Sequence, residues 1–270
     1  MNRMKLQRLL CATLTLFAVL VCGYGYSAES SGGRILVIYN NIPGDPNSNL
    51  SLGGGFAAWI EVDGKVVLFD TGADSKTLDD NLRKSNLEVG KIAAVVLSHD
   101  HGDHTGGLPL LAELRVNVYI PRSSNREDAG RVPGLTLTPV DDPRQILPGV
   151  WTTGQMTAEF QGAPIAEQAL IIEQEDGLAI VTGCAHVGIV EIVKATKALF
   201  PQKKIKLVAG GFHLRDLSEG EVRPISDAFK EMGVEKVGPS HCTGGAAIEL
   251  FKKEWKDNFV RFYLGDQYLF

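Results

Sequence analysis

Short apolar runs alternate along the chain with segments in which an apolar side chain returns every third or fourth residue. The runs predict buried strands, and the periodic segments predict amphipathic helices. The expected strands are Arg34–Tyr39, Phe56–Val62, Lys65–Phe69, Ile92–Leu97, Ala169–Glu173, Leu178–Thr182, Lys206–Ala209, Lys236–Gly238 and Phe259–Leu264. The expected helices are one that Ser75 caps, with apolar positions at Leu78, Leu82 and Leu87, and then Gly188–Phe200, Glu221–Met232 and Ala246–Trp255.

Two Asp-Gly pairs mark tight turns between predicted strands. Asp63-Gly64 and Asp176-Gly177 each join two apolar runs, which indicates a hairpin in each half of the chain. The stretch from Asn125 to Pro148 is rich in Pro, Asp and Gly and predicts a loop. Two β-rich halves with added helices predict an α/β (α+β) fold, a four-layer αββα sandwich whose sheets pack face to face. No linker interrupts residues 32–270, so we expect one domain there.

The N-terminal segment has the pattern of a secretory signal peptide. Three basic residues precede an apolar run from Leu9 to Cys22, and small and turn residues follow as far as Ala28. The run suits a signal peptide and is shorter than the ~20 residues of a membrane-spanning helix. We therefore expect residues 1–28 to be cleaved and the mature chain to be exported, to a bacterial periplasm. An uncleaved membrane anchor and a lipoprotein modified at Cys22 are the alternatives.

Composition narrows the class of protein further. The chain is 44% hydrophobic and 22% charged, which excludes intrinsic disorder. Its formal net charge of −5 becomes −8 without residues 1–28, because the leader holds three basic residues and no acidic one. An acidic chain does not favour nucleic acid, and no later apolar run is as long as the leader's, so we expect neither a nucleic-acid partner nor stable membrane association after cleavage. The oligomeric state is left open.

One loop concentrates the residue types that bind metal ions. His99, His101 and His104 lie with Asp100 and Asp103 in six consecutive positions, directly after a predicted strand. Imidazole and carboxylate groups are ligands for Zn²⁺ and related divalent ions. A single histidine is more often a hydrogen-bonding residue, but three on one glycine-bordered loop favour a metal site. We therefore expect one or two divalent ions, with Zn²⁺ first and Mn, Fe or Ni as alternatives.

The loop resembles the H-x-H-x-D-H motif of the metallo-β-lactamase superfamily. The segment L-F-D-T-G, which contains Asp70, is similar to a second element of that superfamily. The resemblance implies that His99 and His101 bind one ion, and that Asp103 and His104 face a second. It implies that Asp70 orients the loop without binding metal; a simple strand-end turn is the alternative for that residue. The αββα sandwich is also the fold of this superfamily.

Three further histidines each follow a predicted strand. They are His186 in G-C-A-H, His213 in G-G-F-H and His241 in S-H-C-T-G-G. The resemblance makes His241 a ligand of the second ion, and we expect His186 to bind metal as well. His213 is expected to contact substrate or orient a ligand, and metal ligation is the alternative for it. The backbone N–H groups of Gly244 and Gly245, at a predicted helix start, are candidates for holding an anionic substrate group.

At two positions the chain departs from the superfamily pattern. Gln155 stands where a histidine is usual, so His186 is expected to supply the missing ligand. Cys184 stands where a bridging aspartate is usual. Three roles stay open for it: a buried small residue behind the ligands, a thiolate ligand, or a disulfide partner of Cys242, since export permits a disulfide. With these departures, the chain resembles a subgroup of the superfamily whose members are named 7,8-dihydropterin-6-yl-methyl-4-(β-D-ribofuranosyl)aminobenzene 5′-phosphate synthase.

These features predict a metal-dependent hydrolase. A metal-bound hydroxide would attack an ester, lactone or phosphoester in a small molecule that carries an anionic group. Asp103 is expected to orient the attacking water or accept its proton, and His213 to hold the substrate. A synthase or transferase with a phosphorylated aromatic or pterin-like substrate is the first alternative. A non-catalytic protein that binds metal or a small ligand is the second. True β-lactam hydrolysis is disfavoured by Gln155 and Cys184.

Overall fold

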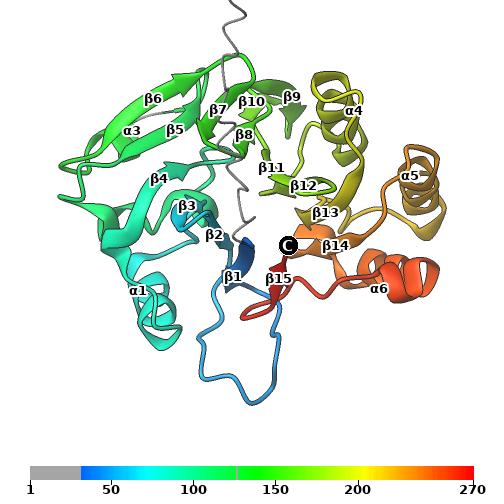
Figure 1. Ribbon diagram of the computed structural model, residues 1–270, viewed down its shortest axis with the longest axis horizontal. Coiled ribbons are helices and arrows are strands. Elements are labelled where there is room, and N and C mark those ends of the chain that lie inside the picture. Colours follow the sequence, from blue (N-terminus) through cyan, green and yellow to red (C-terminus); the bar gives the residue numbers. More distant parts are fainter. Residues whose placement is uncertain (1–31, 126) are drawn as a thin grey trace, which may run out of the picture.

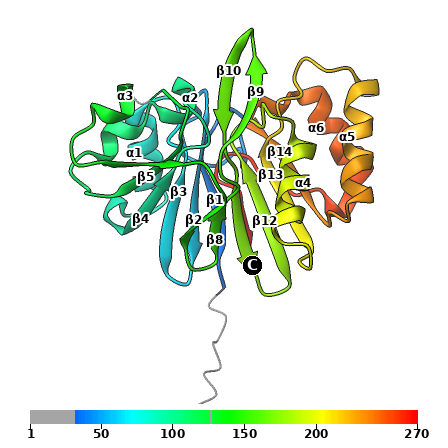
Figure 2. The same cartoon turned by 90° about the horizontal axis from the view of Figure 1, so that it is seen from above.

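The structure is a computed structural model that describes residues 32–125 and 127–270. Two β-sheets stand face to face, with helices on the outer side of each (Figures 1 and 2). This arrangement confirms the predicted four-layer αββα sandwich. The expected leader, residues 1–28, lies outside the described residues. Within the described part, every helix is too short or too polar to traverse a bilayer.

The first sheet has the order β15-β1-β2-β3-β4-β5-β6. Its strands β1 to β4 lie at predicted apolar runs, whereas β5 and β6 had no predicted counterpart. The hairpin at Asp63-Gly64 is confirmed, with Val62 paired to Lys65. Strands β3, β4, β5 and β6 run parallel to one another. The strands are β1 (Arg34–Asn40), β2 (Phe56–Val62), β3 (Lys65–Phe69), β4 (Ile92–Val96), β5 (Asn117–Pro121), β6 (Thr136–Val140) and β15 (Gln267–Leu269).

The second sheet has the order β14-β13-β12-β11-β8-β7. The predicted hairpin at Asp176-Gly177 is confirmed, with Gln174 paired to Gly177. Strands β12, β13 and β14 run parallel. The strands are β7 (Arg144–Leu147), β8 (Val150–Thr152), β11 (Leu170–Gln174), β12 (Gly177–Thr182), β13 (Ile205–Gly211) and β14 (Val237–Ser240); a separate hairpin consists of β9 (Met156–Phe160) and β10 (Ala163–Glu167).

Three buried apolar clusters account for the four layers. The central cluster joins the two sheets and includes Phe56 and Phe69 from one and Leu170 from the other. A second packs α4, α5 and α6 on the second sheet, and a third packs α1 on the first. The helices are α1 (Ser75–Lys84), α2 (Gly102–Thr105), α3 (Glu127–Gly130), α4 (Ile189–Leu199), α5 (Glu219–Glu231) and α6 (Gly245–Trp255), with 3₁₀ turns at Val89–Lys91, Leu108–Leu111, His241–Thr243 and Lys256–Asn258.

Several local predictions were wrong. The cap of α1 is Asp74 and not Ser75: the Asp74 carboxylate accepts from the Thr77 N–H at 2.7 Å. Leu87 lies beyond the end of that helix, although it is buried in the same cluster. The expected closing strand Phe259–Leu264 forms only isolated bridges, and the final strand is β15.

The stretch from Asn125 to Pro148 is also more ordered than its composition indicated. It contains α3 and the strands β6 and β7, which lie at the edge of one sheet each. Edge strands tolerate Pro and polar residues because one side of their backbone needs no ladder partner. The proline-rich composition is therefore compatible with strands at these two positions.

Candidate metal centre

The candidate site lies where parallel strands of both sheets end. Asp70 directly follows β3, and His99 lies three residues after the end of β4; these strands are parallel neighbours in the first sheet. His186, His213 and His241 follow β12, β13 and β14, which are parallel neighbours in the second. Because the carboxyl ends of parallel strands meet at one edge, residues far apart in the sequence converge there. The sequence analysis expected these residues at strand ends, and the structure brings them together.

The backbone is strained at several of these strand ends. Asp70, Ala185, His213 and His241 all have positive φ angles, of 57°, 60°, 54° and 45°. Residues with a Cβ atom rarely adopt this conformation, and its cost is commonly found at functional sites. Each strand therefore turns sharply at the point where it delivers a side chain to the site.

Asp70 is the centre of a buried network under the histidine loop. Its carboxylate accepts hydrogen bonds from the Ser98 N–H at 2.7 Å, from the Ser98 hydroxyl at 2.8 Å and from His104 Nδ1 at 2.7 Å. The Ser98 hydroxyl in turn lies 2.8 Å from His99 Nδ1. Both imidazoles thus use Nδ1 as a donor to these oxygens, and their Nε2 atoms face the other ligand candidates. These contacts are compatible with the predicted role of Asp70 in orienting the loop, which stays a prediction.

His186 and His241 are oriented in the same way from the other sheet. His241 Nδ1 lies 2.7 Å from Asn41 Oδ1, and His186 Nδ1 lies 3.3 Å from Glu167 Oε1. His241 Nε2 is buried and has no hydrogen-bond partner. A buried nitrogen lone pair without a partner is costly in a metal-free protein and is what a cation would satisfy. The residues present therefore fit a bound metal ion.

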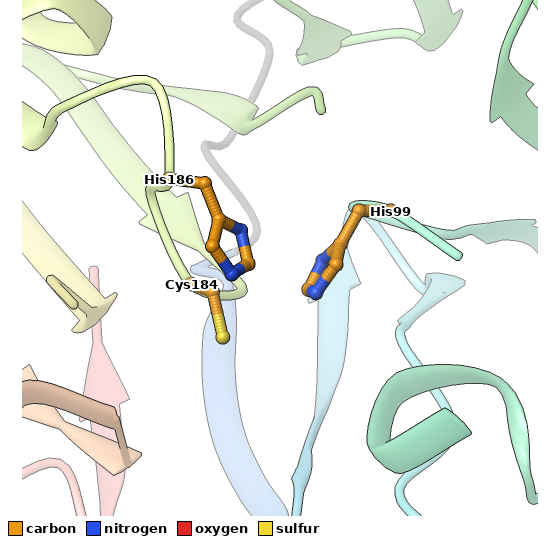
Figure 3. A group of neighbouring side chains, drawn as sticks. All are labelled: His99, Cys184 and His186. Carbon is orange, nitrogen blue, oxygen red and sulfur yellow. The ribbon is translucent and has the colours of Figure 1, made fainter. Parts of the chain in front are cut away.

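Cys184 is the point at which the donor groups overlap. Among the described residues, ligand atoms that lie within 4.8 Å of one another form three groups, and Cys184 belongs to all of them: His99–Cys184–His186, His104–Cys184–His241 and Cys184–His213–Cys242. Figure 3 shows His99 facing Cys184 and His186 across the space between the two sheets. Cys184 Sγ is 3.3 Å from His104 Nε2. Both Cys184 and Cys242 are free, so the structure contains no disulfide between them.

Gly183 permits this convergence. A Cβ atom at this position would lie 2.1 Å from Ser98 Oγ and 2.8 Å from Asp70 Oδ2, so any side chain would push the two halves of the site apart. The Gly183-Cys184 pair therefore combines the smallest residue at the contact between the sheets with a sulfur donor beside it.

His101 and Asp103 lie at the open side of the cluster. His101 Nδ1 is 3.0 Å from His99 Nε2. Asp103 Oδ2 is 3.6 Å from His104 Nε2 and 3.8 Å from His241 Nε2, and its side chain is 43% exposed. The Asp103 carboxylate could therefore contact a cation bound between His104 and His241, or a water molecule in the adjoining pocket.

The surroundings of His99 and His241 favour their neutral imidazole form. Burial, with further contributions from neighbouring histidines, lowers the pKa of His99 and of His241 well below the usual value. Neutral imidazole is the form that binds metal. Burial also lowers the pKa of His104, but the Asp70 carboxylate outweighs it, and the net shift is upward.

The two thiols are shifted in opposite directions. The hydrogen bond with Cys242 and burial raise the pKa of Cys184 well above its usual value. Burial would raise the pKa of Cys242 too, but hydrogen bonds with Cys184 and His213 lower it to about 5. A cation beside either sulfur favours its thiolate form.

A pocket of about 290 Å³ opens over this cluster. Its wall includes Asp103, Phe160, His213 and Arg215, together with His101, Gln161, Cys184, His186, Asp216, His241 and Cys242. Phe160 comes from the β9–β10 hairpin, which projects beyond the two sheets in Figure 2, and its ring centroid is 4.6 Å from that of His186. Arg215 is a cation within the pocket wall. The pocket can therefore hold a small molecule with an anionic group.

Three residues named by the sequence analysis lie apart from this pocket. Gln155 forms hydrogen bonds with Ser123, at 2.7 Å to its N–H and 3.1 Å to its hydroxyl, and does not line the pocket. Gly244 lies at the start of α6 against the backbone of Arg215, and Gly245 follows it. Neither glycine lines the pocket, and their role in holding an anion stays a prediction.

Sequence reasoning did not identify Asn41, Glu167 or Arg215. Asn41 and Glu167 are the hydrogen-bond partners of ligand candidates that lie 200 and 19 residues away in the sequence. Asn41 follows a predicted strand, which is a weak signal. Glu167 directly precedes the predicted strand at Ala169, and Arg215 lies two residues after His213.

A family comparison agrees with this geometry. Residues 50–200, which include the histidine loop and Cys184, match the model of the metallo-beta-lactamase superfamily. The chain belongs to this superfamily. Proteins with this fold bind divalent metals, and the chain has His and Cys groups that could bind one.

Individual relatives refine the comparison. A Methanocaldococcus jannaschii protein named 7,8-dihydropterin-6-methyl-4-(beta-D-ribofuranosyl)-aminobenzene-5'-phosphate synthase is 30% identical over 259 residues, which cover 78% of this chain and 88% of that protein. The crystal structure of Tm1679, described as a metal-dependent hydrolase of the beta-lactamase superfamily, is 28% identical with a TM-score of 0.74, covering 87% of this chain and 98% of that one. Zn²⁺-bound PqqB from Methylobacterium extorquens shares the fold at 15% identity, with a TM-score of 0.53 and coverage of 87% and 99%.

Glu167 offers a test of the site's outer contacts. Replacing it with alanine removes the acceptor for His186 Nδ1 and for the Ala185 N–H, which lies 2.9 Å from Glu167 Oε1. We expect metal affinity, measured by competition with a chromogenic chelator, to fall by roughly 10- to 100-fold, as is typical when a ligand loses its oriented partner. Glu159→Ala, on the exposed β9 strand, is the control. Equal affinities for the two variants would show that Glu167 does not orient His186.

Proposed function

We propose that the chain is a metal-dependent hydrolase that cleaves an ester, lactone or phosphoester bond in a small molecule. The observation that carries this proposal is the convergence of imidazole Nε2 atoms and the Cys184 sulfur beneath an open pocket. Imidazole and thiolate donors suit Zn²⁺, which we propose as the resident ion. One ion would be held by His99, Cys184 and His186, with His101 beside them, and a second by His104, Cys184 and His241.

Bound divalent ions would supply Lewis acidity, lowering the pKa of water and stabilising negative charge on oxygen. The residues of the chain then supply position and proton transfer. Asp103 is exposed to the pocket and lies beside His104 and His241, so it can accept a proton from water there. Arg215 can bind an anionic group, and His213 can donate a hydrogen bond to it. His213 lines the pocket, which supports its proposed contact with substrate.

A synthase or transferase reaction is the second candidate. The observation in its favour is the 30% identity to the archaeal protein whose name describes a synthase. This candidate predicts a metal-loaded protein that does not hydrolyse simple esters. The pattern of the first 28 residues supports the further proposal that the protein acts in an exported compartment, on small molecules rather than nucleic acid.

Metal analysis joined to a substrate screen tests these candidates. The purified protein would be assayed for bound Zn, Mn, Fe and Ni and for turnover of phosphodiesters, phosphomonoesters, carboxylic esters and lactones. We expect hydrolysis of at least one class, and a loss of at least about 10³-fold on chelation, because the metal contributes several kcal/mol to such reactions. Bound metal with no hydrolysis in any class would overturn the hydrolase proposal and favour the synthase or a non-catalytic metal protein.

A further inference from the structure

A second pocket of about 290 Å³ lies beside the one over the metal centre. Its wall is mainly apolar and comes from the segment before α4, the start of α4, the segment after β13 and the helix α5. The larger aliphatic members are Ile189, Val190, Leu214, Leu217 and Ile225, and Ala185 and Phe212 also line it. Glu191 is its one acidic lining residue among the described residues, and no Lys or Arg lines it there. This pocket, which we call the apolar pocket, therefore suits an uncharged hydrophobic group.

The apolar pocket adjoins the metal centre directly. His186 and His213 line both pockets, and their ring centroids are 4.4 Å apart. The His186 side chain is almost fully buried, whereas His213 is half-buried. His186 and His213 therefore form the boundary that the two pockets share. The Phe160 ring lines the pocket over the metal centre, and its centroid is 5.0 Å from that of the His213 ring.

Leu217 lies at the opening of the apolar pocket and is 36% exposed. It is one of three large hydrophobic residues with such exposure in the described part of the chain, the others being Leu52 and Leu269. Hydrophobic surface that remains open beside a polar site is typical of ligand pockets, in which a few polar groups fix orientation and an apolar wall contributes affinity.

From this juxtaposition we propose that the apolar pocket binds an aromatic group of the substrate. The substrate class is then an aryl-substituted ester or phosphoester. Its anionic, scissile part lies over the metal centre beside Arg215, and its ring passes His213 into the apolar pocket. The inference rests on the proposed function for the scissile part, but the apolar pocket can be tested without metal.

The first experiment measures the pocket alone. The chelator-treated protein is titrated with 1-anilinonaphthalene-8-sulfonate, whose fluorescence rises when its rings enter an apolar site. We expect saturable binding that weakens at least about tenfold in Val190→Trp, which fills the pocket, and in Leu217→Asn, which makes its opening polar. Leu269→Asn is the matched control, because Leu269 is exposed in β15, away from the pocket. Absent binding, or equal binding by all variants, would overturn the inference.

The second experiment measures selectivity on the Zn²⁺-loaded protein, with phenylphosphonate and methylphosphonate as probes in calorimetry. We expect the phenyl compound to bind about tenfold tighter, the ratio expected from ~1.4 kcal/mol of apolar burial, and the ratio to fall to about one in Val190→Trp. Equal affinity in the unaltered protein would overturn the inference. If neither phosphonate binds, the anionic substrate of the proposed function is excluded, and the fluorescence titration still decides whether the apolar pocket binds aromatic groups.

Discussion

Replacing Cys184 with alanine is expected to remove bound metal and to abolish hydrolysis. Cys184 supplies the one donor that all three groups of ligand atoms share, so its loss affects the centre on both sides. The loss in metal affinity should exceed the 10- to 100-fold that is typical of removing only an outer hydrogen-bond partner, about 100-fold or more. Elemental analysis after dialysis, together with turnover of whichever substrate class is found, measures both effects.

Cys242→Ala is the matched control for this experiment. Cys242 is also buried and free, but it belongs to only one of the three groups, Cys184–His213–Cys242. The donors of the two remaining groups are intact in that variant, so we expect it to keep metal bound by His99 and His186 and by His104 and His241. Cys184→Ala with unchanged metal content would make Cys184 a buried small residue, which is one of the roles that the sequence left open.

Much of the fold was readable from local sequence pattern. The strands Phe56–Val62 and Lys65–Phe69 have the bounds expected, because an Asp-Gly turn between two apolar runs permits few other structures. The helices α4, α5 and α6 agree with their predicted periods to within a few residues. Buried apolar faces on both sheets and on these helices are compatible with several layered folds, and the resemblance of the histidine loop to the superfamily motif favoured the αββα sandwich among them.

The wrong predictions concern segments whose structure depends on distant partners. Phe259–Leu264 has a strand-like pattern, and Phe262 is fully buried in the central cluster. Its backbone nevertheless pairs only at isolated bridges, while the more polar Gln267–Leu269 pairs with β1. The β9–β10 hairpin was missed because it belongs to neither sheet, and its alternation carries no continuous buried face.

In the site too, residues with a local sequence signal were predicted, and residues that depend on distant contacts were not. His99, His101 and His104 were found because they lie together in the sequence, and His186, His213 and His241 because each follows a strand. The residues that orient them could not be found in this way. Asn41 and His241 are 200 positions apart, and their contact exists only because β1 and β14 end at the same edge of the sandwich.

Replacing Asp70 with alanine is expected to lower the stability of the metal-free protein by about 3–5 kcal/mol. Asp70 and His104 are both completely buried, and removing one member of a buried charged pair leaves the other without compensation. Two further donors, the N–H and hydroxyl of Ser98, would also lose their acceptor. Burial raises the pKa of Asp70, and His104 opposes that shift. The ionised form of the Asp70 carboxyl is therefore stabilised by His104. Urea denaturation of the chelator-treated protein measures the change.

Asp103→Ala separates this effect from metal binding. Asp103 belongs to the same loop, but its side chain is 43% exposed, and its carboxylate lies 3.6 Å from His104 Nε2 and 3.8 Å from His241 Nε2. Without metal its removal should cost less than about 1 kcal/mol, as for an exposed ion pair. If the two variants lose the same stability, Asp70 does not hold the loop through a buried network. If only Asp70→Ala is destabilised, the geometry of the histidine loop is built into the fold before any ion binds, because its supporting contacts contribute to folding in the metal-free protein.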